Sequence, residues 1–559
     1  MHPRARHGLL ALALTAALSL GTTPATASSS GSPSGTPGSR AHSSAAASRA
    51  LARAHALFAP ARSAQRRTPS SGTPHATAGG RREATLVLRD LAARLDEMTP
   101  SDRTAARAIL ARPTEGANAT DPVGYAPDDT VQAICSTHVC VHWTTTGDQA
   151  VPATDTTGAP DGGPDGVPDQ VALTDRVLEQ VWAQQVGTMG YLAPRADAIG
   201  GSYADGTPFT DADTAKLDVY LVDSGSLGLY GYCAPDLDSP HTASRTAAYC
   251  ALDNDFSTSQ FAGNPVTSLK ATAAHEFFHA VQFGYDAGED VWLMESTAAW
   301  MESQVYPAIH DNRQFLSTGP LGHPGIPLDY FDPNPDDPGY YPQYGGWVFW
   351  QLAGETFGPG VVRDVWTRAQ RSGQYSLTAL KVALAARHTD LVTFFARFGA
   401  VNHYPGRAYR HGSLYRVAPL AEPGPFVMTP KRMSAGPIKR ILDHLTNKTV
   451  RFRPGAALRG RRALRLVFNL GSRYRASAAT VVVHLKDGTL ARHAVGLDRH
   501  GEGHLRVPFS RARVSFVEVT LTNASTRYHC YQRVPVLSCE GVPLDDSVKD
   551  VLSARVVAG

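Results

Sequence analysis

Hydrophobic residues recur at helical spacing through much of the chain before residue 420, with a few short strand-like runs between them. Beyond that point the pattern changes to closely spaced runs rich in Val, Leu and Phe, which is typical of antiparallel sheets. The pattern predicts an α+β region at 121–420 and a C-terminal antiparallel β-sandwich at 421–559. The strands expected in the second region are 463–468, 479–485, 504–508 and 514–522.

The chain before residue 121 has two different characters. Residues 1–27 combine a basic start, an apolar stretch and a small-residue cleavage pattern, which predicts a secretory signal peptide. Residues 28–120 are expected to form a disordered or propeptide-like region. Within it, residues 28–80 are rich in Ser, Ala, Gly, Pro and Arg, which predicts disorder or loose helix, whereas residues 82–112 have helical spacing. Two interpretations stay open: a propeptide that covers an active-site cleft until it is cleaved, or a linker with a small helical extension.

The α+β region is expected to begin near Pro122. A helix should start at Asp169, and another should be capped by Asn264, with Pro265 in its first turn. Residues 360–400 have enough apolar residues at helical spacing for two more helices. The remaining expected elements are strands at 139–143, 216–222 and 247–252 and helical segments at 292–302 and 340–352.

The helix that follows Pro265 carries the candidate chemistry. His275 and His279 are four residues apart, so their imidazoles lie on one helix face and can reach one metal ion. Glu276 lies between them, where its carboxylate can act on water rather than bind the metal. The flanking residues 271–281 are almost all small or apolar, which predicts a buried helix. Satisfied core histidines are the alternative, but the complete pattern favours zinc.

A catalytic zinc ion usually has three protein ligands and one open position. No third His follows His279 closely, whereas several acidic residues do. Glu289 and Asp290 lie in a loop-like run and are expected to cap the next helix. Glu295 lies in a mostly apolar helical segment, where a carboxylate without a partner is costly. Glu302, two turns further on, fits either a hydrogen-bond acceptor for a ligating His or a solvated helix end.

These motifs carry a resemblance to known families. WLMESTAAWME at 292–302 resembles the W-L-N-E-G-F-A-x-x-x-E segment of the gluzincin metallopeptidases. Together with AYCALDNDF, TAAHEFFHAVQFGYD and YGGWVF, it is similar to the MXAN_6640-type family of secreted bacterial metalloproteases over about residues 120–410. The resemblance implies Zn²⁺ ligands at His275, His279 and Glu295 and a general base at Glu276.

The same resemblance implies a fold. The implied fold is a zincin-like catalytic domain, in which a mixed sheet and the zinc helix are followed by a helical subdomain. It also assigns the strand at 247–252 to the edge of that sheet, where an extended peptide substrate adds by backbone pairing.

An acidic loop at 155–169 is a second candidate metal site. Asp161, Asp165 and Asp169 alternate with Gly and Pro in a way that resembles the calcium loops of secreted repeats, which supply hard oxygen ligands. Gly163 stands where a further acidic ligand would help. The loop therefore fits either a Ca²⁺ site or a solvated turn in which Asp169 is the N-cap of the next helix.

The six Cys of the chain fall into three local groups. An even number of Cys with near partners in an exported chain predicts three disulfides. Proximity alone suggests the pairs, which are Cys135 with Cys140, Cys233 with Cys250, and Cys530 with Cys539.

Tyr344 is a further candidate for the catalytic machinery. A Tyr hydroxyl near zinc can donate a hydrogen bond to the oxyanion that develops on a scissile carbonyl. An ordinary core Tyr is the alternative. His403 is a second residue that could supply such a donor.

Composition narrows the function. The chain of 559 residues is too long for one core, and its net charge of +3 gives no indication of a nucleic-acid partner. No segment after the signal reaches the roughly 18 apolar residues of a membrane helix, so we expect a secreted protein without a membrane anchor. We expect a zinc metalloendopeptidase acting on protein or peptide substrates. The alternative is an exported binding or adhesion protein with a catalytically inactive zincin domain.

Overall fold

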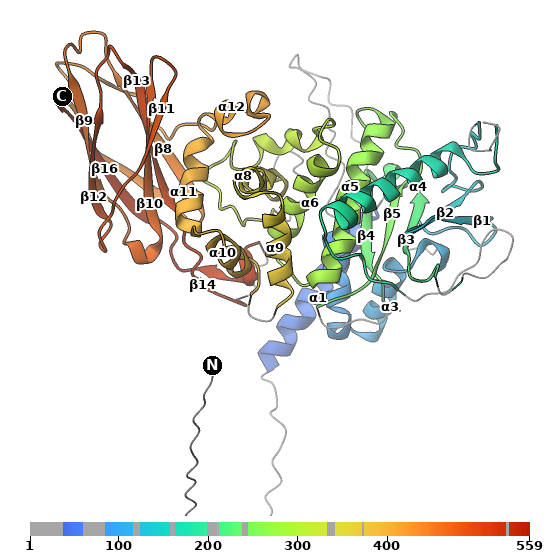
Figure 1. Ribbon diagram of the computed structural model, residues 1–559. Coiled ribbons are helices and arrows are strands. Elements are labelled where there is room, and N and C mark those ends of the chain that lie inside the picture. The colour runs from blue at the N-terminus through green and yellow to red at the C-terminus, as the bar shows by residue number, and fades with distance from the viewer. Residues whose placement is uncertain are drawn as a thin grey trace, which may run out of the picture.

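The computed structural model describes residues 37–59, 84–115, 123–156, 163–197, 210, 212–237, 244–332, 341–371, 374–532 and 536–559. In Figure 1, helices and a first sheet lie at one end, a helical region lies in the middle, and the C-terminal strands lie at the other end. The mixture of helices and sheets agrees with the expected α+β class. The segment expected to be a signal peptide lies outside the described residues.

The first sheet contains the three strands expected from the sequence and two further ones. Its strands are β1 (Val131–Cys135), β2 (Val139–Thr144), β3 (Leu217–Val222), β4 (Gly231–Pro235) and β5 (Ala248–Asp253). Their order is β1-β2-β3-β5-β4. The three inner strands are parallel, and each outer strand is antiparallel to its neighbour, so the sheet is mixed.

The edge strand is not the one expected. The strand at 247–252, observed as β5, pairs with β3 on one side and with β4 on the other, so it lies inside the sheet. The edge beside it is formed by β4, a five-residue strand. Strand order depends on the path of the chain between strands, which the local hydrophobic pattern does not contain.

Successive residues of the sheet face two different hydrophobic cores, as the period of two in a strand requires. Val219 packs with the helices on one face, and Tyr220 packs with the N-terminal helices on the other. The first face is covered by α4 (Asp169–Trp182) and α5 (Pro265–Asp286). The second face is covered by α1 (Pro37–Leu57), α2 (Ala84–Ala93) and α3 (Pro100–Ile109).

The folded part of the chain therefore begins well before Pro122. Within 28–120, the expectation of disorder or loose helix does not hold for 45–57, because Ala50 and Ala54 of α1 are fully buried. The helical segment expected at 82–112 forms α2 and α3, joined by a short 3-10 turn at Leu95–Glu97. These helices share one hydrophobic core with the sheet.

A helical region follows the first sheet. It includes α6 (Val291–Val305), α7 (Pro342–Gly345), α8 (Trp347–Phe357), α9 (Gly360–Ala369), α10 (Leu377–Ala385), α11 (Leu391–Val401) and α12 (Pro405–Ala408). In the described part of 360–400 there are three helices rather than the two expected, because breaks after Ala369 and Ala385 divide the apolar pattern.

Nine of the C-terminal strands form two sheets that share one hydrophobic core. One sheet has the order β11-β10-β13-β8-β6 and the other β12-β9-β16-β7. All neighbours are antiparallel except β6 and β8. The strands are β6 (Phe426–Met428), β7 (Ser434–Leu442), β8 (Thr446–Pro454), β9 (Arg462–Asn469), β10 (Ser477–Leu485), β11 (Leu490–Ala494), β12 (Glu502–Pro508), β13 (Val514–Asn523) and β16 (Val548–Ala558).

The three disulfides form between the Cys pairs expected from proximity. They are Cys135–Cys140, Cys233–Cys250 and Cys530–Cys539, and no Cys is left free. The first links β1 to β2 and the second links β4 to β5. The third closes a loop beside the short strands β14 (Tyr528–His529) and β15 (Val542–Pro543). Among the described residues, no helix has both the length and the apolar character to cross a membrane.

Candidate metal centre

Helix α5 presents the two candidate His ligands from one buried face. The helix begins as the sequence predicts, because the Asn264 side chain accepts a hydrogen bond from the amide of Thr267 and Pro265 occupies the first turn. His275 and His279 are 1 % and 0 % exposed, and the centroids of their rings are 4.9 Å apart. The motif therefore lies inside the protein.

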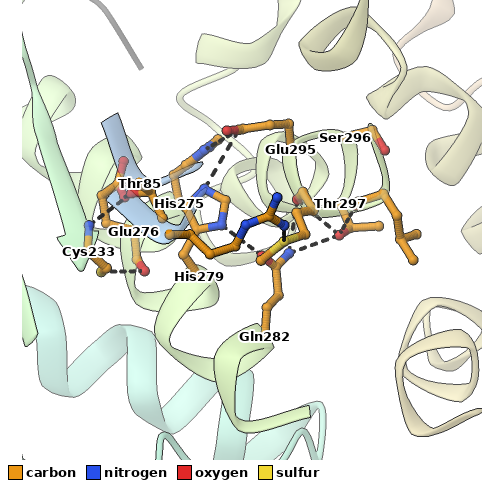
Figure 2. Close-up of polar contacts among 12 residues, drawn as sticks. Thr85, Cys233, His275, Glu276, His279, Gln282, Glu295, Ser296 and Thr297 are labelled. Atoms are coloured by element: carbon orange, nitrogen blue, oxygen red, sulfur yellow. Dashed lines mark hydrogen bonds and ion pairs between the residues drawn. The ribbon is translucent and has the colours of Figure 1, made fainter. Parts of the chain in front are cut away.

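Helix α6 adds a carboxylate to this pair. The Glu295 Oε2 atom lies 3.2 Å from His275 Nε2 and 3.6 Å from His279 Nε2, and the Glu295 side chain is fully buried. Figure 2 shows the two imidazoles and the carboxylate pointing toward one another from two neighbouring helices. One potential ligand atom from each of these three residues lies within 4.8 Å of the others.

The polar atoms of this cluster fit a metal ion better than a purely structural network. His279 Nε2 and Glu295 Oε1 are buried and have no hydrogen-bond partner among the residues that the structure describes. Buried polar atoms are rarely left in this state, because the desolvation cost is not recovered. A metal ion bound by two imidazole nitrogens and a carboxylate oxygen would satisfy both atoms.

Two further side chains fix the orientation of the imidazoles. Glu302 Oε1 lies 2.9 Å from His275 Nδ1, and Gln282 Oε1 lies 2.7 Å from His279 Nδ1. Gln282 is held in turn, because its Nε2 donates to the carbonyl of Met294 at 2.9 Å. Each imidazole thus has its Nδ1 engaged and its Nε2 directed at the shared centre, which is how a His that binds a metal is usually held by a neighbouring side chain.

The pKa values of His275 and Glu295 are shifted in opposite directions. Burial alone would lower the pKa of His275, but its hydrogen bonds to Glu295 and Glu302 outweigh burial and raise that pKa to about 10. Burial alone would raise the pKa of Glu295, but the charge of His279 and the hydrogen bond from His275 lower that pKa to about 2. The cluster therefore combines an anionic carboxylate with two imidazoles in a buried environment.

The other acidic residues near α6 are engaged elsewhere. Glu289 accepts hydrogen bonds from the amides of Asp290 and Ser376. Asp290 occupies the N-cap position of α6, but its side chain does not cap the helix. The Asp290 carboxylate instead accepts from the Tyr375 hydroxyl and the Cys539 amide.

Glu276 lies on the same helix but is not part of the three-residue cluster. Its side chain is 3 % exposed, and its Oε2 accepts a hydrogen bond of 2.8 Å from the hydroxyl of Thr85 on α2. The Thr85 hydroxyl also accepts a hydrogen bond of 2.9 Å from the amide of Cys233 on β4 (Figure 2). The general-base candidate is thus covered by a residue from the N-terminal helices.

Thr85 and Gln282 are the two site residues that sequence reasoning missed. Gln282 stands three residues after His279, on the same helix face, so its position offered a weak signal. Thr85 is 191 residues away from Glu276 in the chain, and nothing in its local sequence indicates the contact.

The two candidate oxyanion donors differ in position. Tyr344 is buried on α7, with its ring centroid 6.0 Å from that of His275 and 5.0 Å from that of Phe315. His403 faces the C-terminal sheet instead. Burial lowers its pKa to about 4, and the charged groups that act on it include Glu518 and Arg451. The structure therefore brings Tyr344, and not His403, to the metal cluster.

The acidic loop is described only in part, so the calcium site stays a prediction. Asp161 lies outside the described residues. The Asp165 carboxylate accepts a hydrogen bond from the amide of Val167, and the Asp169 carboxylate accepts from the amide and hydroxyl of Thr156. The N-cap of α4 is Pro168, one residue before the expected Asp169. Within the described residues, only the cluster of α5 and α6 brings together three candidate metal ligands.

Comparisons with known proteins do not identify the chain. No protein-family model and no curated protein matches it. Among solved structures, one match is a family GH115 4-O-methyl-alpha-glucuronidase with specificity for decorated arabinogalactans. That match has 8% identity and a TM-score of 0.14, and it covers 53% of this chain and 42% of the glucuronidase. The chain thus spans less than half of that enzyme, and the similarity is too low to carry an argument about fold or function.

Proposed function

We propose that this protein is a secreted zinc-dependent metallopeptidase. The observation that carries the proposal is the convergence of His275, His279 and Glu295 on one buried point, with Glu276 beside it on the same helix. Two imidazoles and a carboxylate are a ligand set found in catalytic zinc sites, and such sites leave a further coordination position for the reaction.

The proposed roles follow from the positions of the side chains. His275, His279 and Glu295 would hold Zn²⁺, and Glu302 and Gln282 keep the two imidazoles in place through their Nδ1 atoms. When bound, zinc would supply a Lewis acid that polarises a carbonyl group and makes water more acidic.

Glu276 is proposed as the general base. Its carboxylate takes a proton from water as the scissile carbonyl is attacked, and it then passes the proton to the leaving amine. Tyr344, whose ring neighbours His275, is the candidate donor to the oxyanion that develops on that carbonyl. A domain that had lost its activity would have no need to keep a carboxylate buried at position 276.

We interpret the rest of the molecule in the same framework. The mixed sheet, α5 and the following helices correspond to a zincin-like catalytic domain, and the two C-terminal sheets correspond to a β-sandwich. The three disulfides support export to an oxidising compartment, where such bonds persist.

The test compares the wild-type protein with Glu276→Gln. Both proteins are purified at the same N-terminal length, their zinc content is measured by mass spectrometry, and casein hydrolysis is followed. We expect equal zinc content but a loss of hydrolysis of roughly 100-fold or more, because a positioned general base contributes about that much. Hydrolysis that is measurable and equal in both proteins would exclude the proposed mechanism.

Two further variants make the test specific. Glu295→Gln should lose zinc as well as activity, because it removes the anionic ligand. Glu502→Gln makes the same chemical change at an exposed position on β12 and should leave zinc content and hydrolysis unchanged. If Glu295→Gln kept its zinc, the assignment of the third ligand would be wrong.

A further inference from the structure

The candidate site is closed to a polypeptide in the described form of the protein. His275, Glu276, His279 and Glu295 are between 0 % and 3 % exposed. A peptidase must bring the scissile bond within reach of the metal and the general base, and the near-attack distance is only about 3–3.5 Å. Some part of the structure must therefore move before a substrate can bind.

Thr85 contacts both the proposed general base and the outer strand of the sheet. The Thr85 hydroxyl donates a hydrogen bond to Glu276 Oε2 at 2.8 Å. The oxygen of that hydroxyl also accepts a hydrogen bond from the amide of Cys233 at 2.9 Å. Thr85 is fully buried. The proton acceptor proposed for Glu276 is thus already engaged by a donor from the chain itself.

The second group that Thr85 engages lies on the sheet edge. Cys233 is the central residue of β4, the outer strand beside β5. An extended peptide adds to a sheet through the free N–H and C=O groups of its edge strand. Because α2 packs against β4 and Thr85 takes the Cys233 amide, α2 lies where such a peptide would pair.

Residues 84–115, here called the N-terminal helical segment, are also anchored at two points that follow Thr85 in the chain. Near one end, Arg89 Nη1 donates to the carbonyl of Glu289 at 2.7 Å, beside the start of α6. At the other end, Arg112 donates at 2.6 Å each to Asp197 and Asp218, and it also contacts Asp236. The segment is therefore held by contacts along its length and not only at Thr85.

We propose that the N-terminal helical segment is an inhibitory segment, in which Thr85 blocks both Glu276 and the edge strand until the segment is displaced. This inference rests on the proposed metallopeptidase function, and it identifies how the activity of that site is held back. It also distinguishes between the two interpretations of residues 28–120, because a passive linker would not place a hydroxyl on the catalytic carboxylate.

The test uses the full zinc-loaded chain and the variant Thr85→Val. Valine keeps the shape of threonine but leaves a buried carboxylate and a buried amide without their partner, so the closed form loses stability. We expect roughly tenfold faster transfer of zinc to a chelator and roughly tenfold faster hydrolysis of a short fluorogenic peptide. Thr104→Val is the matched control, because Thr104 is exposed on α3 of the same segment and should change neither rate.

A second variant keeps the test decisive if Thr85→Val does not fold. Arg89→Gln removes the anchor at the Glu289 carbonyl from a half-buried position, and it should also raise both rates. Its control is Arg107→Gln, an exposed change on α3. If the folded variants hydrolyse the peptide no faster than the wild type, the segment is a fixed part of the fold and the proposal is wrong.

Zinc content separates this failure from a failure of the proposed function. A wild-type chain that binds zinc and hydrolyses casein, but whose Thr85 and Arg89 variants behave like the wild type, contradicts the inhibitory segment alone. A chain that binds no zinc in any variant contradicts the metallopeptidase, and the inhibitory role of the segment is then excluded as well.

Discussion

At the scale of residues, the site depends on how each imidazole is held. His275 and His279 direct Nε2 toward Glu295, while Nδ1 of each contacts a second side chain. For His275 that side chain is the carboxylate of Glu302, which is 3 % exposed. A buried carboxylate at this position fixes the tautomer of the ring and increases the basicity of its other nitrogen.

This arrangement predicts that Glu302→Gln weakens zinc binding without abolishing it. Loss of such an outer partner typically costs about 10-fold to 100-fold in metal affinity. Competition with a fluorescent chelator measures the dissociation constant directly. The exposed substitution Glu502→Gln serves as the control, and equal zinc affinity in Glu302→Gln and wild type would show that Glu302 has no role in orienting His275.

The sequence predicted the residues of the centre better than their surroundings. His275, Glu276 and His279 follow from a motif whose spacing matches one helical turn, and Glu295 follows from the cost of a carboxylate in an apolar helix. Thr85 could not be predicted, because its contact with Glu276 depends on how the N-terminal helices pack on the sheet. The calcium site stays a prediction, because Asp161 lies outside the described residues, while the carboxylates at 165 and 169 accept hydrogen bonds from their own loop.

At the scale of elements, α5 must start at a defined residue for its two imidazoles to reach α6. The Asn264 side chain accepts from the amide of Thr267 at 3.2 Å, which satisfies one of the helix donors that lack an intrahelical partner. Nearly all of the helix after Leu269 is buried. The cap at Asn264 lies before this buried part, at the exposed beginning of the helix.

We therefore predict that Asn264→Ala lowers the free energy of unfolding by about 1 kcal/mol, the usual value of an N-cap side chain. Asn264→Asp should be close to wild type, because it keeps an acceptor and adds a negative charge at the helix N-terminus. Urea unfolding of the three proteins, followed by circular dichroism, gives the comparison. An alanine variant as stable as the aspartate variant would show that the cap contributes nothing.

Strands with a clear apolar pattern in their own sequence were predicted. A strand whose position depends on pairing with another strand was not. The expected strands at 139–143, 216–222 and 463–468 match β2, β3 and β9 to within one or two residues, because each is a run of apolar residues with strand periodicity. β4 is short and includes Gly231 and Pro235, so its pattern is weak. Its place at the sheet edge arises from its pairing with β5, which only the folded structure reveals.

At the scale of the whole molecule, a buried ionic contact joins the helical region to the C-terminal sheets. His444, between β7 and β8, lies with its Nε2 3.0 Å from Asp329 and its Nδ1 2.6 Å from Asp546. The Tyr528 hydroxyl donates to the second oxygen of Asp329. Burial alone would lower the pKa of His444, but the two carboxylates raise it to about 9.

This contact predicts how stability depends on pH. Because the pKa of His444 is higher in the folded protein than its ordinary value near 6.5, the stabilisation is complete below pH 6.5 and is lost as pH rises through 9. The expected loss is about 3 kcal/mol, since one pKa unit corresponds to about 1.4 kcal/mol. His444→Gln keeps a hydrogen-bonding side chain but cannot carry the charge.

The measurement is the difference in unfolding free energy between wild type and His444→Gln at pH 6 and at pH 9. Urea unfolding can be followed by the intrinsic fluorescence of the seven Trp residues, one of which, Trp292, donates its indole N–H to Ser538 beside the same contact. We expect the advantage of the wild type to shrink as pH rises, and we expect no such trend for His504→Gln, an exposed change on β12. A difference that stays constant across this range would mean that the pKa of His444 is the same in the folded and the unfolded protein, and the ionic contact with the two carboxylates would then add nothing to stability.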